Sequence, residues 1–327
     1  MATQIKPPQS VLLEVRNLKK HFRVSTFNQA VQTVHALNGI SFLLREGETL
    51  GLVGESGCGK STAARTILRL VEPTSGEIFY RNQDLLALGQ NKLRSLRKEM
   101  QIIFQDPFAS LNPRKKIGKI LGEPFDIHGF TNPEEKKERV SWLLDRVGLS
   151  SDQIEKYPHE LSGGQLQRIG IARAIALNPS LIIADEPVSA LDVSIRAQII
   201  NLLLDLKKSM RISYLLISHD MAIVRHFCDR VAVMYLGKII EIADSASLFN
   251  NPRHPYTEAL LAAIPSIDPE SKKQRVKIKG DLPSAMDMPK GCAFHTRCPI
   301  REKKCEQSVP QLKEVHLGHH VACFLRE

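Results

Sequence analysis

The chain has 327 residues, of which 43% are hydrophobic and 24% charged, a composition that excludes a disordered protein and suits one large domain with a smaller one. No apolar run approaches the roughly 18 residues of a membrane span, and the first residues lack the apolar core of a secretory signal, so we expect a cytosolic protein. The net charge of +10 fits either an ordinary basic surface or an anionic partner, namely nucleic acid or the cytoplasmic leaflet of a membrane.

Two short strands are predicted at the start of the chain. Residues 11–15 form an apolar run, and residues 34–44 alternate between apolar and polar side chains. A small antiparallel strand region is therefore expected before residue 45. Between the two strands, Phe22 offers an aromatic face that can stack on a nucleobase, although its spacing fits a place in the hydrophobic core equally well.

The next feature is a phosphate-binding loop with the pattern G-x-x-x-x-G-K-S. A buried strand is predicted over 49–53 before it, and a helix over 61–70 after it. Glycines let successive backbone N–H groups turn toward anionic oxygens, and the helix start adds a partial positive charge. In this pattern Lys60 reaches the β- and γ-phosphates, and the Ser61 hydroxyl coordinates Mg²⁺. The residues expected to bind ATP here are Gly54, Glu55, Ser56, Gly57, Cys58, Gly59, Lys60, Ser61 and Thr62.

Three further apolar strands end in polar side chains. They are predicted at 100–104, 181–185 and 214–218, and they are followed by Gln105, by Glu186 and by His219. Ligands of α/β proteins bind where parallel strands end, so these side chains are candidates for the same site.

Each of these side chains has a chemical role to offer. Asp185 can hold Mg²⁺, Glu186 can accept a proton from an attacking water, and His219 can sense the γ-phosphate. The alternatives are a helix-capping pair for the two carboxylates and an ordinary surface position for the histidine.

A mostly helical stretch is predicted from 107 to about 160, with breaks at 112–113, 122–124 and 132–133. It leads to the pentapeptide Leu-Ser-Gly-Gly-Gln at 161–165, which precedes a helix reaching about residue 177. A serine and two glycines at a helix start offer a hydroxyl, free N–H groups and the helix dipole to an anion. Taken alone, Ser162 could be an ordinary N-cap. A hairpin is predicted over 230–243.

Across about residues 11–250 these motifs, in this order, resemble the ATP-binding subunit of ATP-binding-cassette (ABC) transporters. The resemblance implies an α/β fold, with a RecA-like core, an antiparallel β subdomain and a helical subdomain at about 107–175. It implies a head-to-tail dimer in which ATP lies between the phosphate loop of one subunit and the pentapeptide of the other. Phe22 falls at the adenine-stacking position, and Asp192 at the dimer interface.

The resemblance also assigns roles to the motif residues. Glu186, His219 and Gln105 would be catalytic, and Ser61, Gln105 and Asp185 would hold Mg²⁺. The residues acting in trans on ATP would be Ser162, Gly163, Gly164 and Gln165. No member of this set is degenerate, so the resemblance implies ATP hydrolysis rather than passive binding.

The C-terminal part of the chain resembles one class of ABC transporter ATPases in particular. Residues 251–261, 280–284 and 291–299 resemble the extension of peptide-importer ATPases, most of all the F-type ATPase subunit of dipeptide permeases. Two domains are therefore expected, 1–250 and 251–327. The implied function is ATP-driven uptake of dipeptides or oligopeptides; importers of glutathione or murein peptides share this ending and are the alternative.

This resemblance implies a set of partners. They are two membrane permease subunits, a second ATPase subunit that is a paralogue, and a periplasmic or extracellular peptide-binding protein. The chain would sit as a peripheral protein at the cytoplasmic face of the cell membrane, with no nucleic acid bound. Two other classes are alternatives: a nucleic-acid-associated ABC ATPase, which usually has two cassettes in one chain, and a binding module without hydrolysis, which Glu186 and His219 disfavour.

Four of the six cysteines lie close together near the end, at Cys292, Cys298, Cys305 and Cys323. Disulfides are not expected in a reducing compartment, and the tightly spaced pairs of structural zinc sites are absent. The wider spacing favours a [4Fe–4S] cluster, to which the family resemblance also points, with zinc as the alternative. We expect a structural or regulatory role for this site.

Overall fold

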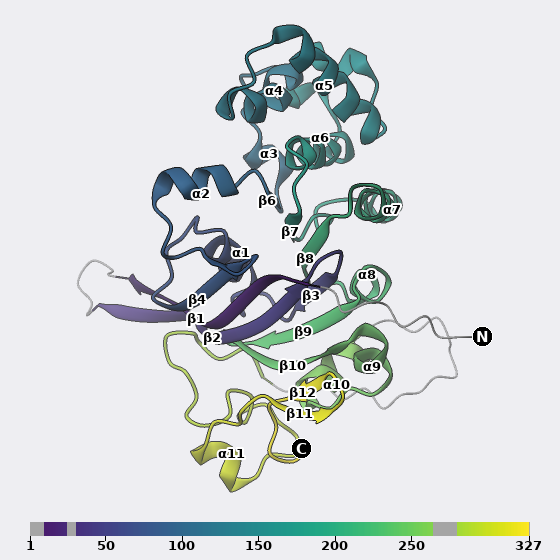
Figure 1. The fold of residues 1–327 in the computed structure, drawn as a ribbon. Coiled ribbons are helices and arrows are strands. Elements are labelled where there is room, and N and C mark those ends of the chain that lie inside the picture. Colours follow the sequence, from purple (N-terminus) through teal and green to yellow (C-terminus); the bar gives the residue numbers. More distant parts are fainter. Residues whose placement is uncertain (1–9, 25–30, 264–279, 327) are drawn as a thin grey trace. The chain divides into compact units, whose positions relative to one another are not determined.

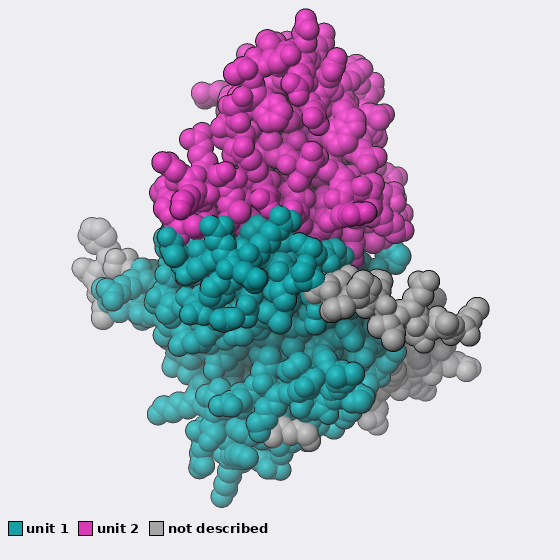
Figure 2. Space-filling view, in the orientation of Figure 1, with its two compact units in different colours: residues 1–87, 217–327 teal, residues 88–216 magenta. Residues whose placement is uncertain are grey.

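The computed structural model describes residues 10–24, 31–263 and 280–326 (Figure 1). The chain divides into two units (Figure 2). Unit 1 comprises residues 1–87 and 217–327, and unit 2 comprises residues 88–216. Each unit contains part of the predicted nucleotide motifs. Among the described residues, the structure contains no helix that is both long and apolar enough to cross a membrane.

Unit 1 begins with an antiparallel sheet in the order β2-β1-β4-β5 among the described residues. Its strands are β1 (Val11–Val24), β2 (Gln32–Arg45), β4 (Ser75–Tyr80) and β5 (Gln83–Asp84). In the centre Leu13 pairs with Leu44 of β2 and with Tyr80 of β4, and all three side chains are buried. The predicted antiparallel region is confirmed, although β1 runs nine residues beyond the predicted end at 15, since Lys19 to Val24 still pair with β2.

The second set of strands in unit 1 follows the order β11-β12-β10-β9-β3. The parallel pair in it is β3 (Thr49–Val53) beside β9 (Arg230–Tyr235). Every residue of β3 is buried, which explains why its sequence is a continuous apolar run rather than an alternating one. The predicted hairpin is formed by β9 and β10 (Lys238–Asp244).

The C-terminal residues join this sheet. Strand β12 (His319–Val321) pairs with β10, and β11 (Lys313–His316) pairs with β12. The Glu241 carboxylate of β10 is fully buried and accepts hydrogen bonds from the N–H groups of Arg253 and His254, and it lies 2.7 Å from His319 Nε2. One buried acid therefore connects strand β10 with the start of α10 and with strand β12. The helices of this unit are α1 (Lys60–Ile67), α8 (Met221–Phe227), α9 (Ser245–Asn250), α10 (Pro255–Ala262) and α11 (Lys303–Gln307).

Unit 2 contains the strands β6 (Met100–Ile103), β7 (Leu181–Asp185) and β8 (Ser213–Ser218), in the order β8-β7-β6. Strands β6 and β7 are parallel, with Ile103 opposite Ala184, so both strands end at the same edge. The last two residues of β8 belong to unit 1. The helical segments are α2 (Gln90–Leu96), α3 (Pro107–Ser110), α4 (Ile117–Ile127), α5 (Pro133–Arg146), η1 (Ser151–Glu155), η2 (Pro158–Glu160), α6 (Gly163–Ile175) and α7 (Val193–Met210).

The predicted break at 122–124 is wrong, because α4 continues through Pro124 to Ile127. A proline inside a helix removes one backbone hydrogen bond and costs about 3 kcal/mol. The helix continues because Ile120, Leu121 and Phe125, on both sides of the proline, are buried in unit 2. Packing therefore outweighs the local preference of Pro124. The break predicted at 112–113 is confirmed, since it lies between α3 and α4, and the break at 132–133 marks the start of α5, with Asn132 as N-cap and Pro133 as first residue.

Candidate nucleotide site

The predicted phosphate loop lies in unit 1, between β3 and α1. Gly54 has φ +154° and Gly59 has φ +107°, a region that disfavours side chains. A Cβ at Gly54 would lie 2.2 Å from the carbonyl oxygen of Met234, and one at Gly59 would lie 2.3 Å from that of Ala36. Both glycines are therefore required by close backbone approach, and the loop is packed against neighbouring strands.

Lys60 is turned into this loop. Its side chain is buried, and its Nζ donates to the carbonyl oxygens of Gly54 at 2.8 Å and Glu55 at 2.9 Å. Cys58 is also buried, which raises the pKa of its thiol in spite of the nearby Lys60 ammonium. The first turn of α1 contains no acidic residue. The loop thus presents a cation and a helix start, which is the chemistry that binds a polyphosphate.

Two side chains from the C-terminal part of unit 1 contact the loop at Glu55. Nη1 of Arg297 lies 3.0 and 3.2 Å from the two carboxylate oxygens of Glu55. The hydroxyl of Tyr256 accepts a hydrogen bond from the Glu55 N–H at 2.9 Å. Neither contact is predicted from the sequence. Arg297 and Tyr256 both lie in stretches that resemble peptide-importer ATPases, but neither spacing nor residue type links them to position 55.

An aromatic cluster holds these two side chains in place. The ring of Phe294, 1% exposed, packs against Tyr235, Tyr256 and His254 at centroid distances of 5.3, 5.5 and 5.6 Å. Since Phe294 is three residues before Arg297, the cluster fixes the segment that carries the arginine. His254 is fully buried, and burial lowers its pKa to about 4 although the nearby Glu241 charge favours protonation.

In unit 2, the ends of β6 and β7 bring two predicted catalytic residues together. The amide Nε2 of Gln105 donates to Oε2 of Glu186 at 3.0 Å, across 81 positions of sequence. Glu186 has φ +47°, and its carbonyl accepts hydrogen bonds from the N–H and the hydroxyl of Ser189. Strained non-glycine backbone is concentrated at functional sites. Asp185, immediately before it, is 3% exposed at the end of β7.

The pentapeptide forms the start of α6 in unit 2. Ser162 is the N-cap, and its hydroxyl accepts from the N–H of Gln165 while the Gln165 side chain accepts from the N–H of Ser162. This capping box occupies two backbone donors, and the first turn has no acidic residue. Ser162 is exposed. Ser162 is therefore an N-cap, and this role is compatible with the predicted binding of an anion at the same helix start.

The remaining predicted residues lie at the surface of their own units. Phe22 on β1 is 36% exposed, with Lys20 Nζ 4.8 Å from its ring centroid, so it is not a core residue. His219 is exposed and lies between β8 and α8 in unit 1. Asp192 is exposed before α7 in unit 2. Their roles stay predictions.

The four C-terminal cysteines are free thiols in one neighbourhood of unit 1. Burial, together with negative charge on Cys305, Cys323 and Cys298, raises the pKa of Cys292 to about 11. The N–H of Cys292 donates to the carbonyl of Cys305 at 2.8 Å. The donor set and its clustering fit a metal or iron–sulfur group, but within the described residues no three such side chains are arranged to hold a metal ion.

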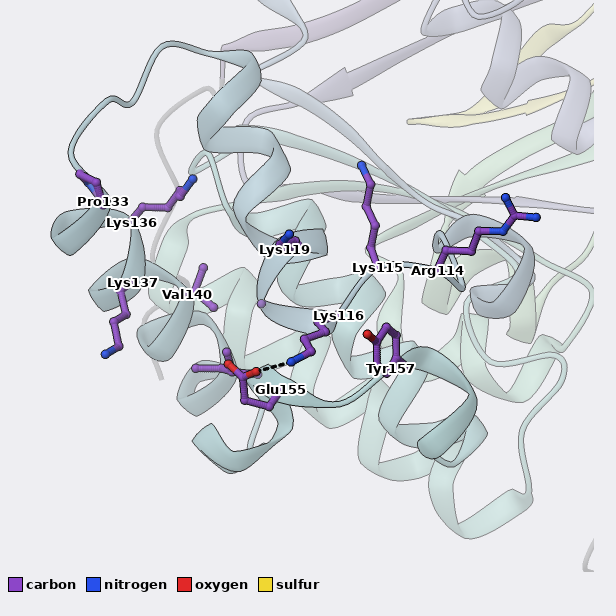
Figure 3. A pocket seen from close by; sticks show the side chains of 12 residues that line it. Arg114, Lys115, Lys116, Lys119, Pro133, Lys136, Lys137, Val140, Glu155 and Tyr157 are labelled. Carbon is purple, nitrogen blue, oxygen red and sulfur yellow. Dashed lines mark hydrogen bonds and ion pairs between the residues drawn. The ribbon is translucent and has the colours of Figure 1, made fainter.

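A cavity of about 540 Å³ lies in unit 2 and contains none of the motif residues. It is lined by six basic side chains, but Lys116 is paired with Glu155 at 2.7 Å, and Lys115 and Lys136 are paired with carboxylates of α4. Figure 3 shows the charged ends of Arg114, Lys115 and Lys137 pointing in different directions. Volume alone does not identify this cavity as a ligand site.

Comparison with known families finds two matches along the chain. Residues 37–189 match the ABC transporter family, and residues 240–305 match the oligopeptide/dipeptide transporter C-terminal region. The first match includes the phosphate loop, Gln105, the pentapeptide and Glu186, and the second includes Tyr256 and Arg297.

Known relatives are similar over nearly the whole chain. The chain is 53% identical to the oligopeptide transport ATP-binding protein AppF of Bacillus subtilis (strain 168), over 97% of this chain and 98% of the relative. It is 48% identical to the dipeptide transport ATP-binding protein DppF of Escherichia coli (strain K12), over 99% and 97%.

Among solved structures, the chain is similar to a post-hydrolysis dimer of the ATP-binding cassette MJ0796 bound to ADP and Pi. The TM-score is 0.64 and the sequence identity 28%, covering 72% of this chain and 99% of that chain. A second similar structure is cbiO1 from Clostridium perfringens, part of an ABC transporter complex, with a TM-score of 0.63 and 29% identity over 74% and 92% of the two chains.

Proposed function

This chain belongs to the family of ABC transporter ATPases that carry the oligopeptide/dipeptide transporter C-terminal region, and from that premise we propose how its residues drive peptide import. It is the ATP-hydrolysing subunit of an ABC importer of peptides. The observation that carries this conclusion is the 53% identity, over nearly all of both chains, to an oligopeptide transport ATP-binding protein.

The proposed nucleotide site begins with the phosphate loop. Lys60 exchanges the carbonyl oxygens of Gly54 and Glu55 for phosphate oxygens, while the N–H groups of residues 55–62 and the start of α1 receive the remaining negative charge. Phe22 stacks on the adenine. The Ser61 hydroxyl, the Gln105 amide and the Asp185 carboxylate would hold Mg²⁺, which would supply positive charge to the phosphates.

Glu186 is proposed as the general base. Its carboxylate already accepts a hydrogen bond from Gln105, which orients it, and its backbone has positive φ. It takes a proton from the attacking water, and His219 contacts the γ-phosphate. The pentapeptide residues Ser162 to Gln165 would bind the ATP held by a second ATPase subunit, with Asp192 at the subunit interface.

The same proposal extends to partners. Family membership implies membrane permease subunits and a substrate-binding protein, and we propose that the second ATPase subunit is a paralogue and that the chain lies at the cytoplasmic face of the membrane.

The four thiols are proposed to hold a [4Fe–4S] cluster, with zinc as the alternative. The supporting observation is that Cys298, Cys305 and Cys323 all influence the pKa of Cys292.

Peptide import is tested by deleting the gene and measuring uptake of labelled dipeptides and oligopeptides by whole cells. Loss of uptake, restored by the intact gene but not by Lys60→Ala, is the expected result. Restoration by Lys60→Ala would contradict ATP-driven import. Uptake of labelled glutathione and murein tripeptide in the same strains distinguishes the alternative substrates.

A further inference from the structure

The phosphate loop of this chain carries a negative charge at a position where a polyphosphate must bind. Glu55 lies directly after Gly54, and its side chain is 28% exposed. An unneutralised carboxylate at this position would repel the phosphates of ATP, because like charges a few ångströms apart repel strongly in a partly buried site. The loop therefore needs a cation that neutralises Glu55 without occupying the place of the phosphates.

Arg297 meets that requirement from the C-terminal part of unit 1. Its side chain is 8% exposed, its Nη1 contacts both carboxylate oxygens of Glu55, and its guanidinium carbon lies 5.9 Å from the ring centroid of Tyr235. Arg297 and Glu55 are 242 positions apart in the sequence. Because the guanidinium is largely buried beside the Tyr235 ring, its charge is screened less by solvent than that of a surface pair.

Two more residues from the C-terminal part of unit 1 lie beside the loop. The Tyr256 hydroxyl accepts a hydrogen bond from the Glu55 N–H, and a Cβ added to Gly57 would lie 3.9 Å from the side chain of Leu282. The C-terminal part of unit 1 thus contacts the loop at Glu55 and lies next to Gly57. Phe294 fixes the segment by packing against Tyr235 and Tyr256.

We propose that Arg297 is a positioning residue for nucleotide binding: it neutralises and orients Glu55, so that the C-terminal region forms part of the nucleotide site. This proposal rests on the proposed function of the phosphate loop. It assigns to the C-terminal region a role in MgATP affinity, in addition to any role in metal binding. The same short segment carries Cys292 and Cys298 beside Arg297.

The test measures equilibrium binding of a fluorescent ATP analogue with Mg²⁺ to the purified full-length chain. Arg297→Met is expected to weaken affinity about tenfold, the size typical for losing a charge-assisted hydrogen bond. The second change Glu55→Gln is expected to restore most of this affinity, because the charge that Arg297 neutralises is then absent. Arg297→Lys keeps the charge but loses the planar group beside Tyr235, so it is expected to retain more affinity than Arg297→Met without matching the original chain.

Arg326→Met is the matched control. Arg326 also forms an ion pair with a glutamate, Glu258, at 3.2 Å in the same C-terminal part of unit 1, but it does not contact the loop. Its replacement should leave the affinity for the ATP analogue unchanged. Loss of affinity in Arg297→Met that Glu55→Gln fails to restore, or no loss at all, would overturn the proposal.

Two further variants keep the outcomes distinct. If Arg297→Met does not fold, the single variant Glu55→Gln tests the proposal. It leaves Arg297 as an uncompensated cation near the phosphates, so the affinity for the ATP analogue should rise. A decrease in that affinity would overturn the proposal. Lys60→Ala tests the proposed function itself. If it binds the analogue as well as the original chain, the loop is not the nucleotide site; if it fails to bind while Arg297→Met binds normally, only the role of Arg297 is wrong.

Discussion

The Gln105 amide donates to the Glu186 carboxylate at 3.0 Å, joining the ends of two parallel strands in unit 2. This bond orients the carboxylate that we propose as the proton acceptor, and it limits rotation of the side chain. The positive φ of Glu186 shows that its position is imposed by the surrounding structure rather than by local preference.

Replacing the proposed base should separate binding from turnover. Glu186→Gln keeps the side-chain volume but cannot accept the proton, so we expect ATP hydrolysis to fall by about 10²-fold or more while ATP stays bound. Phosphate release and retained nucleotide are measured in the assembled importer. Hydrolysis at the original rate would contradict the assignment of Glu186.

Removing the orienting amide should have a smaller effect. Gln105→Ala deletes one hydrogen bond to Glu186 and also the proposed Mg²⁺ ligand, so at saturating Mg²⁺ we expect kcat to fall about fivefold to tenfold, which corresponds to about 1 kcal/mol. Gln101→Ala is the control, because Gln101 is also on β6 but donates to the carbonyl of Arg97. Equal effects of the two changes on kcat would mean that the bond to Glu186 has no role in hydrolysis.

The two glycines of the pentapeptide should differ in their tolerance of a methyl group. A Cβ at Gly164 would lie 2.8 Å from Cγ2 of Ile195, whereas one at Gly163 has its nearest neighbour, Leu191 Cδ2, at 3.7 Å. We expect Gly164→Ala to lower the free energy of unfolding by about 1–3 kcal/mol and Gly163→Ala to change it little. Urea denaturation checks this.

A second substitution tests the cause of that difference. If contact with Ile195 is responsible, Gly164→Ala combined with Ile195→Ala should be more stable than the sum of the two single effects predicts. Strict additivity would show that the clash is relieved by movement of the helix.

The pH dependence of stability should contain a contribution from His254. Its folded-state pKa is lowered to about 4 by burial, so between its unfolded value near 6.5 and about 4 only the unfolded chain binds the proton. The free energy of unfolding should therefore fall with decreasing pH by up to about 1.4 kcal/mol per unit in this window, and the contribution is fully present above pH 6.5.

Urea denaturation of the original chain and of His254→Asn, at several pH values, measures this contribution. Asparagine keeps an acceptor for the Tyr256 N–H but does not titrate. Glu241 and His319 face the same site and are present in both proteins. Burial acts to raise the pKa of Glu241, but the hydrogen bonds it accepts hold its pKa below 4.5, so it contributes at the acidic end of the window. The same slope in both proteins would contradict the assignment to His254.

The cysteine site predicts a specific metal content. Protein purified without oxygen should contain about four iron atoms and four acid-labile sulfides per chain, with absorption near 400 nm that disappears on oxidation. Cys305→Ser should reduce the iron content, whereas Cys228→Ser, a cysteine distant in sequence, should not. Stoichiometric zinc without iron would select the alternative.

Sequence alone determined the nucleotide motifs and most of the elements that carry them. Gly54 to Ser61 and the pentapeptide are local patterns, and a local pattern specifies a loop and a helix start because backbone geometry depends on neighbouring residues. Apolar runs likewise predicted β3, β7 and β8, in which every residue is buried, since a strand covered on both faces needs apolar side chains on both.

Tertiary structure decided which distant residues meet. The Arg297–Glu55 pair spans 242 positions and the Gln105–Glu186 bond 81, and no periodicity links residues so far apart. Packing also decided the course of α4 through Pro124, where buried neighbours override the preference of the proline. Residue types state which interactions are available, but only the folded chain selects which of them form.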